Sequence, residues 1–203
     1  MAAPRERFNI FVALGLLLVA AALCLTAYNL WESWDAGKRS QQVVEQLDAS
    51  IGDYRDGQAF GQKMPVSKVD GHEYLGILSI PELDLTLPVM KDWDYNNLRI
   101  SPCRYSGNYY DDDMVVCAHN YISHFRALQT IRIGVEVRFT NVKGEVFRYV
   151  VTNRETVEPT SIDFMIKNLN NSTEGFAGSW DLSLFTCQPG GATRCAVRCS
   201  RVK

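Results

Sequence analysis

The chain has 203 residues, of which 46% are hydrophobic, and its 21 basic and 23 acidic side chains leave a net charge of -2. This composition excludes an intrinsically disordered or collagen-like chain. Because a dedicated nucleic-acid binder would carry a basic excess, we expect no nucleic acid among its partners. The length suits one globular domain with an additional segment.

An uncharged stretch over residues 8–30 sets the amino terminus apart from this average. About 20 apolar residues, at about 1.5 Å each, span the hydrocarbon core of a membrane. Arg5 and Arg7 precede the stretch, and basic residues favour the cytoplasmic side. We therefore expect residues 1–7 in the cytoplasm, a single transmembrane signal anchor over 8–30, and the rest of the chain outside the cell.

The residues around this stretch bear on whether it stays attached. Trp31 and Trp34 follow it, where aromatic side chains mark the outer membrane interface. A cleaved secretory signal is an alternative, because residues 20–22 are small alanines, and a buried core helix would show a polar face. A lipoprotein signal would need a small residue before Cys24, where Leu23 stands. An uncleaved anchor is the prediction.

Residues 31–73 predict a stalk and linker between this anchor and a globular domain over 74–203. An amphipathic helix is expected over Asp35–Ser50, because Val43 and Leu47 recur at helical spacing. Residues 52–70 mix glycine, proline and polar side chains with weak periodicity, which indicates a linker or a wrap around the domain.

Short strands dominate the domain that follows. Alternating or apolar runs predict them at Gly76–Ile80, Leu83–Leu87, Met114–Ala118, Val135–Thr140, Glu145–Thr152, Glu155–Glu158, Leu182–Thr186 and Cys195–Val202. Short helices are expected at Ser123–Gln129 and Ser161–Leu169. This density of strands, without long helices between them, predicts a mainly β domain: a small antiparallel or mixed barrel rather than a βα fold.

Three chemically capable side chains lie at the ends of predicted strands, which are His119, Cys187 and Arg194. A thiolate is a nucleophile, an imidazole transfers protons, and a guanidinium offers fixed donors to an oxyanion. The structural alternatives are a buried apolar thiol and a solvated arginine. The sequence alone does not bring the three together.

The same segments resemble the signatures of the sortase family. Leu182–Cys187 resembles the strand Thr-Leu-x-Thr-Cys that carries the nucleophile, with Ser183 in place of the first threonine. Arg194–Val197 resembles the family's Arg-x-x-Val, and Val116–Asn120 resembles the segment that holds the catalytic histidine. Further similar segments are Gly76–Pro81, Leu87–Val89 and Val157–Thr160.

The resemblance implies a membrane-anchored cysteine transpeptidase of mostly Gram-positive bacteria, with an eight-stranded β-barrel. Cys187 would attack the threonine carbonyl of a Leu-Pro-x-Thr-Gly-like sorting signal, His119 would protonate the leaving amine, and Arg194 would hold the carbonyl or oxyanion. Thr186 would contact the substrate. An amine of a peptidoglycan precursor or cross-bridge would then resolve the thioester. The expected partners are thus this amine, surface proteins with a carboxy-terminal sorting signal, and the membrane; no cofactor or metal is implied.

Some features depart from the family pattern. The turn between Cys187 and Arg194 has six residues and is short for the family, so Arg198 is a second candidate for the arginine. His119-Asn120 favours class B, whereas the segment Thr160–Asp181 is short for the class B insertion. The subclass is therefore left open.

Two other functions compete with the transpeptidase. One is a secreted cysteine peptidase that hydrolyses cell-wall peptides, although papain-like chains place the cysteine before the histidine. The other is an inactive, anchored binding module, which requires Cys187 to be buried and inert. A redox protein is disfavoured because no Cys-x-x-Cys pair is present.

The remaining cysteines and histidines are expected to be structural. A disulfide between Cys103 and Cys117 is allowed outside the cell. Cys195 and Cys199 lie roughly 13 Å apart on one strand, so they cannot bond and are expected to pack into the barrel. We expect His72 to be exposed and without a role in the site, and His124 to lie at the surface or to pack against other residues. The three residues Asp111–Asp113 are expected to form a solvated turn rather than a calcium site.

Overall fold

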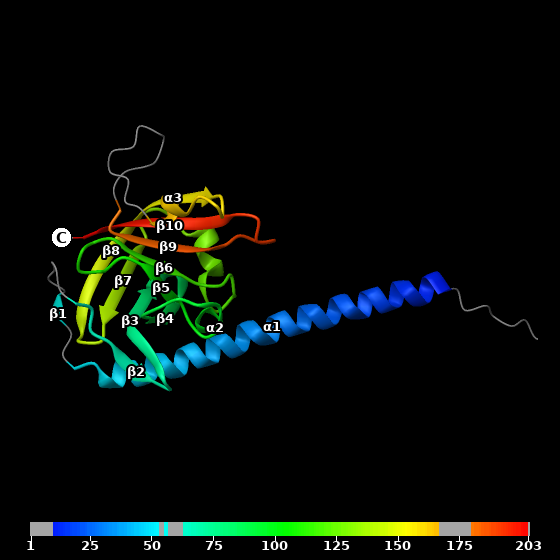
Figure 1. The fold of residues 1–203 in the computed structure, drawn as a ribbon, viewed down its shortest axis with the longest axis horizontal. Coiled ribbons are helices and arrows are strands. Elements are labelled where there is room, and N and C mark those ends of the chain that lie inside the picture. Colours follow the sequence, from blue (N-terminus) through cyan, green and yellow to red (C-terminus); the bar gives the residue numbers. More distant parts are fainter. Residues whose placement is uncertain (1–9, 53–54, 57–62, 167–179, 203) are drawn as a thin grey trace, which may run out of the picture.

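The computed structural model describes residues 10–52, 55–56, 63–166 and 180–202. Its longest element is helix α1, which runs for 41 residues over Ile10–Ser50 (Figure 1). The amphipathic helix expected over Asp35–Ser50 is present, but it does not begin at Asp35, because the segment continues the apolar helix without a break. No proline occurs between residues 10 and 50 to end it.

The two halves of α1 have different surroundings. The apolar half is exposed on all sides, and within the described ranges α1 is the one helix long and apolar enough to cross a membrane. The other half buries one face on the domain, with the 3–4 spacing of an amphipathic helix. The residues of that face are Ser33, Ala36, Ser40, Val43 and Leu47.

Eight strands of the described chain close into a barrel, in the order β8-β10-β9-β6-β5-β4-β3-β7 and back to β8. They are β3 (His72–Ile80), β4 (Leu85–Met90), β5 (Cys103–Ser106), β6 (Met114–Cys117), β7 (Glu136–Asn141), β8 (Glu145–Val157), β9 (Leu182–Cys187) and β10 (Arg194–Arg201). The barrel is mixed, because β4–β5 and β6–β9 are parallel and the other pairs antiparallel. Two short strands, β1 (Arg55–Asp56) and β2 (Ser67–Val69), extend it beside β8 and β3.

Most predicted elements are present, with some shifts. The strand expected from Leu83 begins at Leu85, because Pro81–Leu83 forms the 3-10 helix η1, and Glu155–Glu158 is no separate strand but the end of β8. The expected short helices correspond to η2 (Phe125–Thr130) and α3 (Ile162–Ile166), and residues 167–169 of the second lie outside the described residues. Strands β1, β2 and β5 and helix α2 (Tyr95–Leu98) were not predicted.

The barrel has an apolar core on each side of its wall, because successive residues of a strand point to opposite faces. Leu184 of β9 lies in the interior core, whereas Phe185 lies in an outer core with Val43 and Leu47 of α1. Cys195 and Cys199 pack into the interior core, as predicted.

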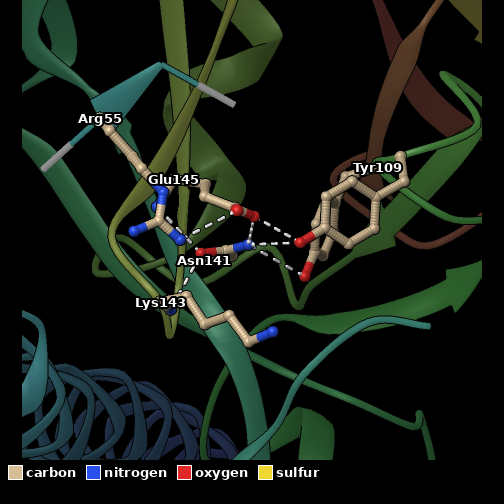
Figure 2. Close-up of polar contacts among 6 residues, drawn as sticks. Arg55, Tyr109, Asn141, Lys143 and Glu145 are labelled. Carbon is tan, nitrogen blue, oxygen red and sulfur yellow. Dashed lines mark hydrogen bonds and ion pairs between the residues drawn. The ribbon is translucent and has the colours of Figure 1, made fainter. Parts of the chain in front are cut away.

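A polar network closes the barrel at the turn from β7 to β8 (Figure 2). Asn141 is fully buried, and its amide nitrogen donates to the Tyr110 hydroxyl at 3.1 Å and to Glu145 Oε2 at 2.7 Å. Arg55 of β1 pairs with the other oxygen of Glu145 at 3.1 Å. Along the long axis of the molecule, the β9–β10 turn lies toward the side of the exposed half of α1, and β1 lies at the opposite end (Figure 1).

Candidate active site

All four residues that the sequence predicts for the active site line one pocket of about 250 Å³. His119, Thr186, Cys187 and Arg194 line it together, although they come from three different segments of the barrel. The strand-end positions explain this convergence, because β6, β9 and β10 are neighbours in the sheet.

The hairpin of β9 and β10 places the thiol and the guanidinium side by side. Cys187 and Arg194 are direct cross-strand partners in the antiparallel register. Such partners point to the same face, with Cβ atoms about 4.5–5.5 Å apart. Gly190 and Gly191 adopt φ values of 84° and 74° in the connecting turn, which glycine tolerates without strain. The short turn therefore keeps the register between Cys187 and Arg194.

Arg194 is held at the rim of the pocket by this same turn. Its Nη1 donates to the carbonyl oxygens of Gly191 at 2.9 Å and of Thr193 at 3.2 Å. A guanidinium has five N–H donors in a fixed fork, so two bonds from one nitrogen orient the group without using its full capacity.

Arg198, the second candidate, is a buried structural residue and does not line the pocket. It is 3% exposed, and its guanidinium pairs with Glu155 at 2.7 Å and donates to Ser183 Oγ at 2.7 Å. It also donates to the Phe164 and Met165 carbonyl oxygens of α3. Arg198 thus fastens α3 to the barrel, and Ser183 has a structural role that the family resemblance did not supply.

The parallel pairing of β6 and β9 brings His119 to the same pocket as Cys187. Cys117 is the register partner of Phe185, so two residues further along each strand lead to His119 and Cys187. Beyond the ladder, the Ala118 amide donates to the Phe185 carbonyl at 3.2 Å, and Thr186 Oγ1 donates to the Ala118 carbonyl at 2.9 Å. Thr186 is 1% exposed, so its hydroxyl ties the two segments together.

The surroundings of His119 favour the neutral imidazole. Burial lowers the pKa of His119, while the carboxylate of Glu32 opposes this change and the guanidinium of Arg99 adds to it. The Tyr121 ring lies 4.9 Å from the His119 ring, centroid to centroid. His119 is therefore a partly buried, proton-exchanging group beside a thiol.

Cys187 differs from the other cysteines of the domain. Cys103, Cys117, Cys195 and Cys199 are buried as free thiols, and burial raises the pKa of each, that of Cys117 to about 12. Cys187 is half-buried and lines the pocket. Among the cysteines of the barrel, Cys187 has the exposure that a nucleophile requires.

One wall of the pocket is aromatic, which the sequence motifs did not predict. Trp93 stacks on Tyr105 with ring centroids 5.1 Å apart, and Tyr105 meets the edge of Phe185 at 5.2 Å. Ile162 and Met165 of α3 line the same pocket. The aromatic cluster Trp93–Tyr95 was visible in the sequence, but β5 went unrecognised and the cluster had no assigned place.

A family model of the sortase domain matches residues 78–202, which is more than half of the chain. The chain belongs to the sortase family. Sortase D of Bacillus subtilis (strain 168) is 24% identical to this sortase over 184 residues, covering 86% of this chain and 87% of the relative. This sortase is accordingly a cysteine transpeptidase, and the barrel is the family's eight-stranded fold.

Solved sortase structures share this fold. Sortase C-3 of Streptococcus pneumoniae superimposes with a TM-score of 0.55 at 22% identity, covering 87% of this chain and 84% of that one. The Clostridium perfringens sortase D5 transpeptidase gives a TM-score of 0.53 at 14% identity, covering 87% and 98%. These relatives are named as classes C and D, whereas the class B resemblance rests on the dipeptide His119-Asn120 alone.

The remaining polar residues that the sequence singled out have structural contacts. Asp112 pairs with Arg201 at 2.9 Å, and Asp113 accepts from the Asn108 amide at 2.7 Å. His124 is fully buried, so of the two expected places, the surface or the packed interior, it takes the second. His72 starts β3 away from the pocket.

Proposed function

We propose that this sortase is a single-pass membrane enzyme that joins surface proteins bearing a Leu-Pro-x-Thr-Gly-like sorting signal to a cell-wall amine. The observation that carries the proposal is the meeting of His119, Cys187 and Arg194 in one pocket, with Cys187 and Arg194 as direct cross-strand partners. The exposed apolar half of α1 is the anchor; residues 1–7 lie in the cytoplasm and the barrel lies outside.

In the first half-reaction, the Cys187 thiolate attacks the carbonyl carbon of the threonine in the sorting signal. A C–S bond forms, and the carbonyl oxygen gains negative charge, which the Arg194 guanidinium stabilises by hydrogen bonding. The protonated imidazole of His119 gives its proton to the departing amine as the C–N bond breaks. The products are a thioester on Cys187 and the released carboxy-terminal fragment.

In the second half-reaction, an amine of a peptidoglycan precursor or cross-bridge attacks the thioester. Neutral His119 takes a proton from the attacking amine, the C–S bond breaks, and Cys187 leaves as a thiolate. The new amide links the surface protein to the cell wall. An anchored enzyme suits this reaction, because substrates tethered to the same membrane face have a raised effective concentration.

The aromatic wall supports a peptide with apolar residues before the scissile bond. Trp93, Tyr105 and Phe185 present ring surface beside the nucleophile, and the leucine and proline of a sorting signal bury apolar area against such a surface. Thr186 lines the pocket next to Cys187, but it is 1% exposed and its hydroxyl donates to the Ala118 carbonyl, so we assign it a role in placing Cys187 and not the substrate contact that the resemblance implies.

The test uses the full chain in detergent micelles with a quenched sorting-signal peptide and hydroxylamine or a glycine peptide as acceptor. A shortened chain beginning at Asp35 is unsuitable, because Ser33 contacts the domain. We expect an amine-linked product, detected by mass spectrometry, that disappears in Cys187→Ala and persists in Cys24→Ala. Cleavage that survives Cys187→Ala would contradict the assignment, and hydrolysis without the amine-linked product would favour the peptidase.

A further inference from the structure

The half of α1 that lies on the domain contacts the segment of residues 118–124, termed here the histidine loop because it carries His119. Ser33 Oγ accepts from the Ile122 amide at 3.1 Å, and the Ser33 carbonyl accepts from Ser123 Oγ at 2.6 Å. About two turns further along the helix, Ser40 Oγ lies 3.3 Å from His124 Nε2. Helix α1 thus holds the carboxy-terminal end of the loop that presents the imidazole.

Three rings connect this contact to the pocket. The Tyr121 ring lies between the two histidine rings, 4.9 Å from His119 and 5.3 Å from His124 between centroids. Burial and the neighbouring Glu32 carboxylate raise the pKa of Tyr121 to about 12, so its hydroxyl stays protonated beside Glu32. A single tyrosine therefore joins a carboxylate of the anchor helix to the ring of His119.

Glu32 has a second partner on the barrel. Its Oε1 lies 3.4 Å from Nε of Arg99, the residue that caps α2, and the Glu32 side chain is only 22% exposed. Glu32 is thus shared between a cation and a phenol at the edge of the site. A carboxylate on an exposed stalk would have neither partner.

We propose that Glu32 of the anchor helix and Arg99 are positioning residues for His119, acting as a charge pair through Tyr121. The inference rests on the proposed function only for the role of His119 in proton transfer. It makes the membrane anchor a structural part of the active site in addition to a tether.

The two charges act on His119 in opposite directions. Burial, the largest effect, lowers the pKa of His119, Glu32 raises it, and Arg99 lowers it. Tyr121 and His124 are the titratable neighbours of the imidazole in its own loop. The titratable side chains that line the pocket with it are Tyr95, Tyr105, Cys117, Cys187 and Arg194. The general acid must be an imidazolium. Glu32 therefore increases the fraction of His119 in the active, protonated form, and Arg99 decreases it.

Opposite signs make the proposal testable against a merely structural role. Glu32→Gln removes the negative charge, so the pKa of His119 falls and the alkaline limb of the kcat profile moves to lower pH. Arg99→Gln removes the positive charge, so the pKa of His119 rises and the alkaline limb of the kcat profile moves to higher pH. Loss of packing alone would reduce activity in the two variants without shifting these limbs apart.

The experiment measures the pKa of His119 by NMR in the full chain in detergent micelles, and kcat and KM for the quenched peptide across pH. Signals of the three histidines are assigned from single His→Gln variants. We expect Glu32→Gln to lower kcat roughly 3- to 10-fold at neutral pH, well short of the 10²–10⁴-fold that a general acid supplies. Glu45→Gln, at an exposed position of the same helix, is the matched control and leaves the titration unchanged.

Arg99→Lys keeps the charge and is expected to restore the wild-type titration. Should Arg99→Gln fail to fold, the other two variants still give different expectations: an unchanged pKa of His119 in Arg99→Lys and a lowered one in Glu32→Gln. The proposal would be overturned if the pKa of His119 were the same in Glu32→Gln and Glu45→Gln. It would also be overturned if this pKa shifted in the same direction in Glu32→Gln and Arg99→Gln. The titration needs no substrate, so its result is independent of whether His119 and Cys187 perform the proposed chemistry.

Discussion

Cys187 and Arg194 lie directly opposite each other across the ladder of β9 and β10, as the last residue of one strand and the first of the next. The turn between them holds the guanidinium by its own carbonyl oxygens. Rigid strand ends of this kind keep two reacting groups within contact distance while leaving them open to a peptide.

Replacing Arg194 is therefore expected to affect the transition state more than substrate binding. Arg194→Ala should lower kcat by about 10²–10³-fold, the loss typical of one oxyanion donor, with a smaller change in KM. Arg194→Lys should recover only part of the rate, because an ammonium lacks the guanidinium fork. Steady-state kinetics with the quenched peptide measure both, with Arg126→Ala, an exposed arginine, as control. Unchanged kcat in Arg194→Ala would exclude the assignment.

The cysteines are expected to separate by reactivity. In a Cys24→Ala background, iodoacetamide should alkylate Cys187 in the native enzyme and reach the other four cysteines of the barrel only after unfolding. Burial and a raised pKa protect those four thiols. Mass spectrometry of tryptic peptides locates the label. Slow labelling of Cys187, at the rate of Cys117, would instead favour an inactive binding module.

Arg198 should matter for stability and not for chemistry. Arg198→Met leaves the Glu155 carboxylate without its partner beside a buried site, which typically costs about 3–5 kcal/mol in the free energy of unfolding. Urea denaturation measures the loss, and Arg198→Met combined with Glu155→Met should recover part of it, because no charge is then left unpaired. Wild-type stability with lost activity would make Arg198 a functional arginine after all.

The sequence singles out three candidate residues that the fold brings into one pocket, but it does not predict the residues that support them. His119, Cys187 and Arg194 stand at strand ends in short motifs, and local patterns carry that information. Glu32 and Arg99 are ordinary charged residues in the sequence. Glu32 stands 87 positions before His119, and only the folded structure brings it to the edge of the site, where it pairs with Arg99. Local periodicity does not report contacts of such separation.

The same limit explains the errors in the elements. Strand β5 is four residues long and half-buried, so it shows neither an apolar run nor a clear alternation. The sequence predicts two strands where the structure has the single strand β8. Residues 152–156 are all polar and lie in exposed or half-buried positions, so they carry no apolar pattern that would mark a strand. Pairing with β10 along its length makes it one strand.

Glu145 provides a pH-dependent prediction at the opposite end of the barrel. Burial pushes its pKa up, but donors on Tyr110, Asn141 and Arg55 together hold the pKa below its usual value. A carboxylate with a lowered folded-state pKa stabilises the fold above the unfolded pKa of about 4.3, and this contribution disappears as pH falls through the lowered value. Glu145→Gln should therefore cost about 1–3 kcal/mol at neutral pH and progressively less in acid. Urea denaturation at stepped pH measures the difference, with exposed Glu158→Gln as the control. A cost for Glu145→Gln that stays constant into acid would show that shape, and not charge, holds this end of the barrel together.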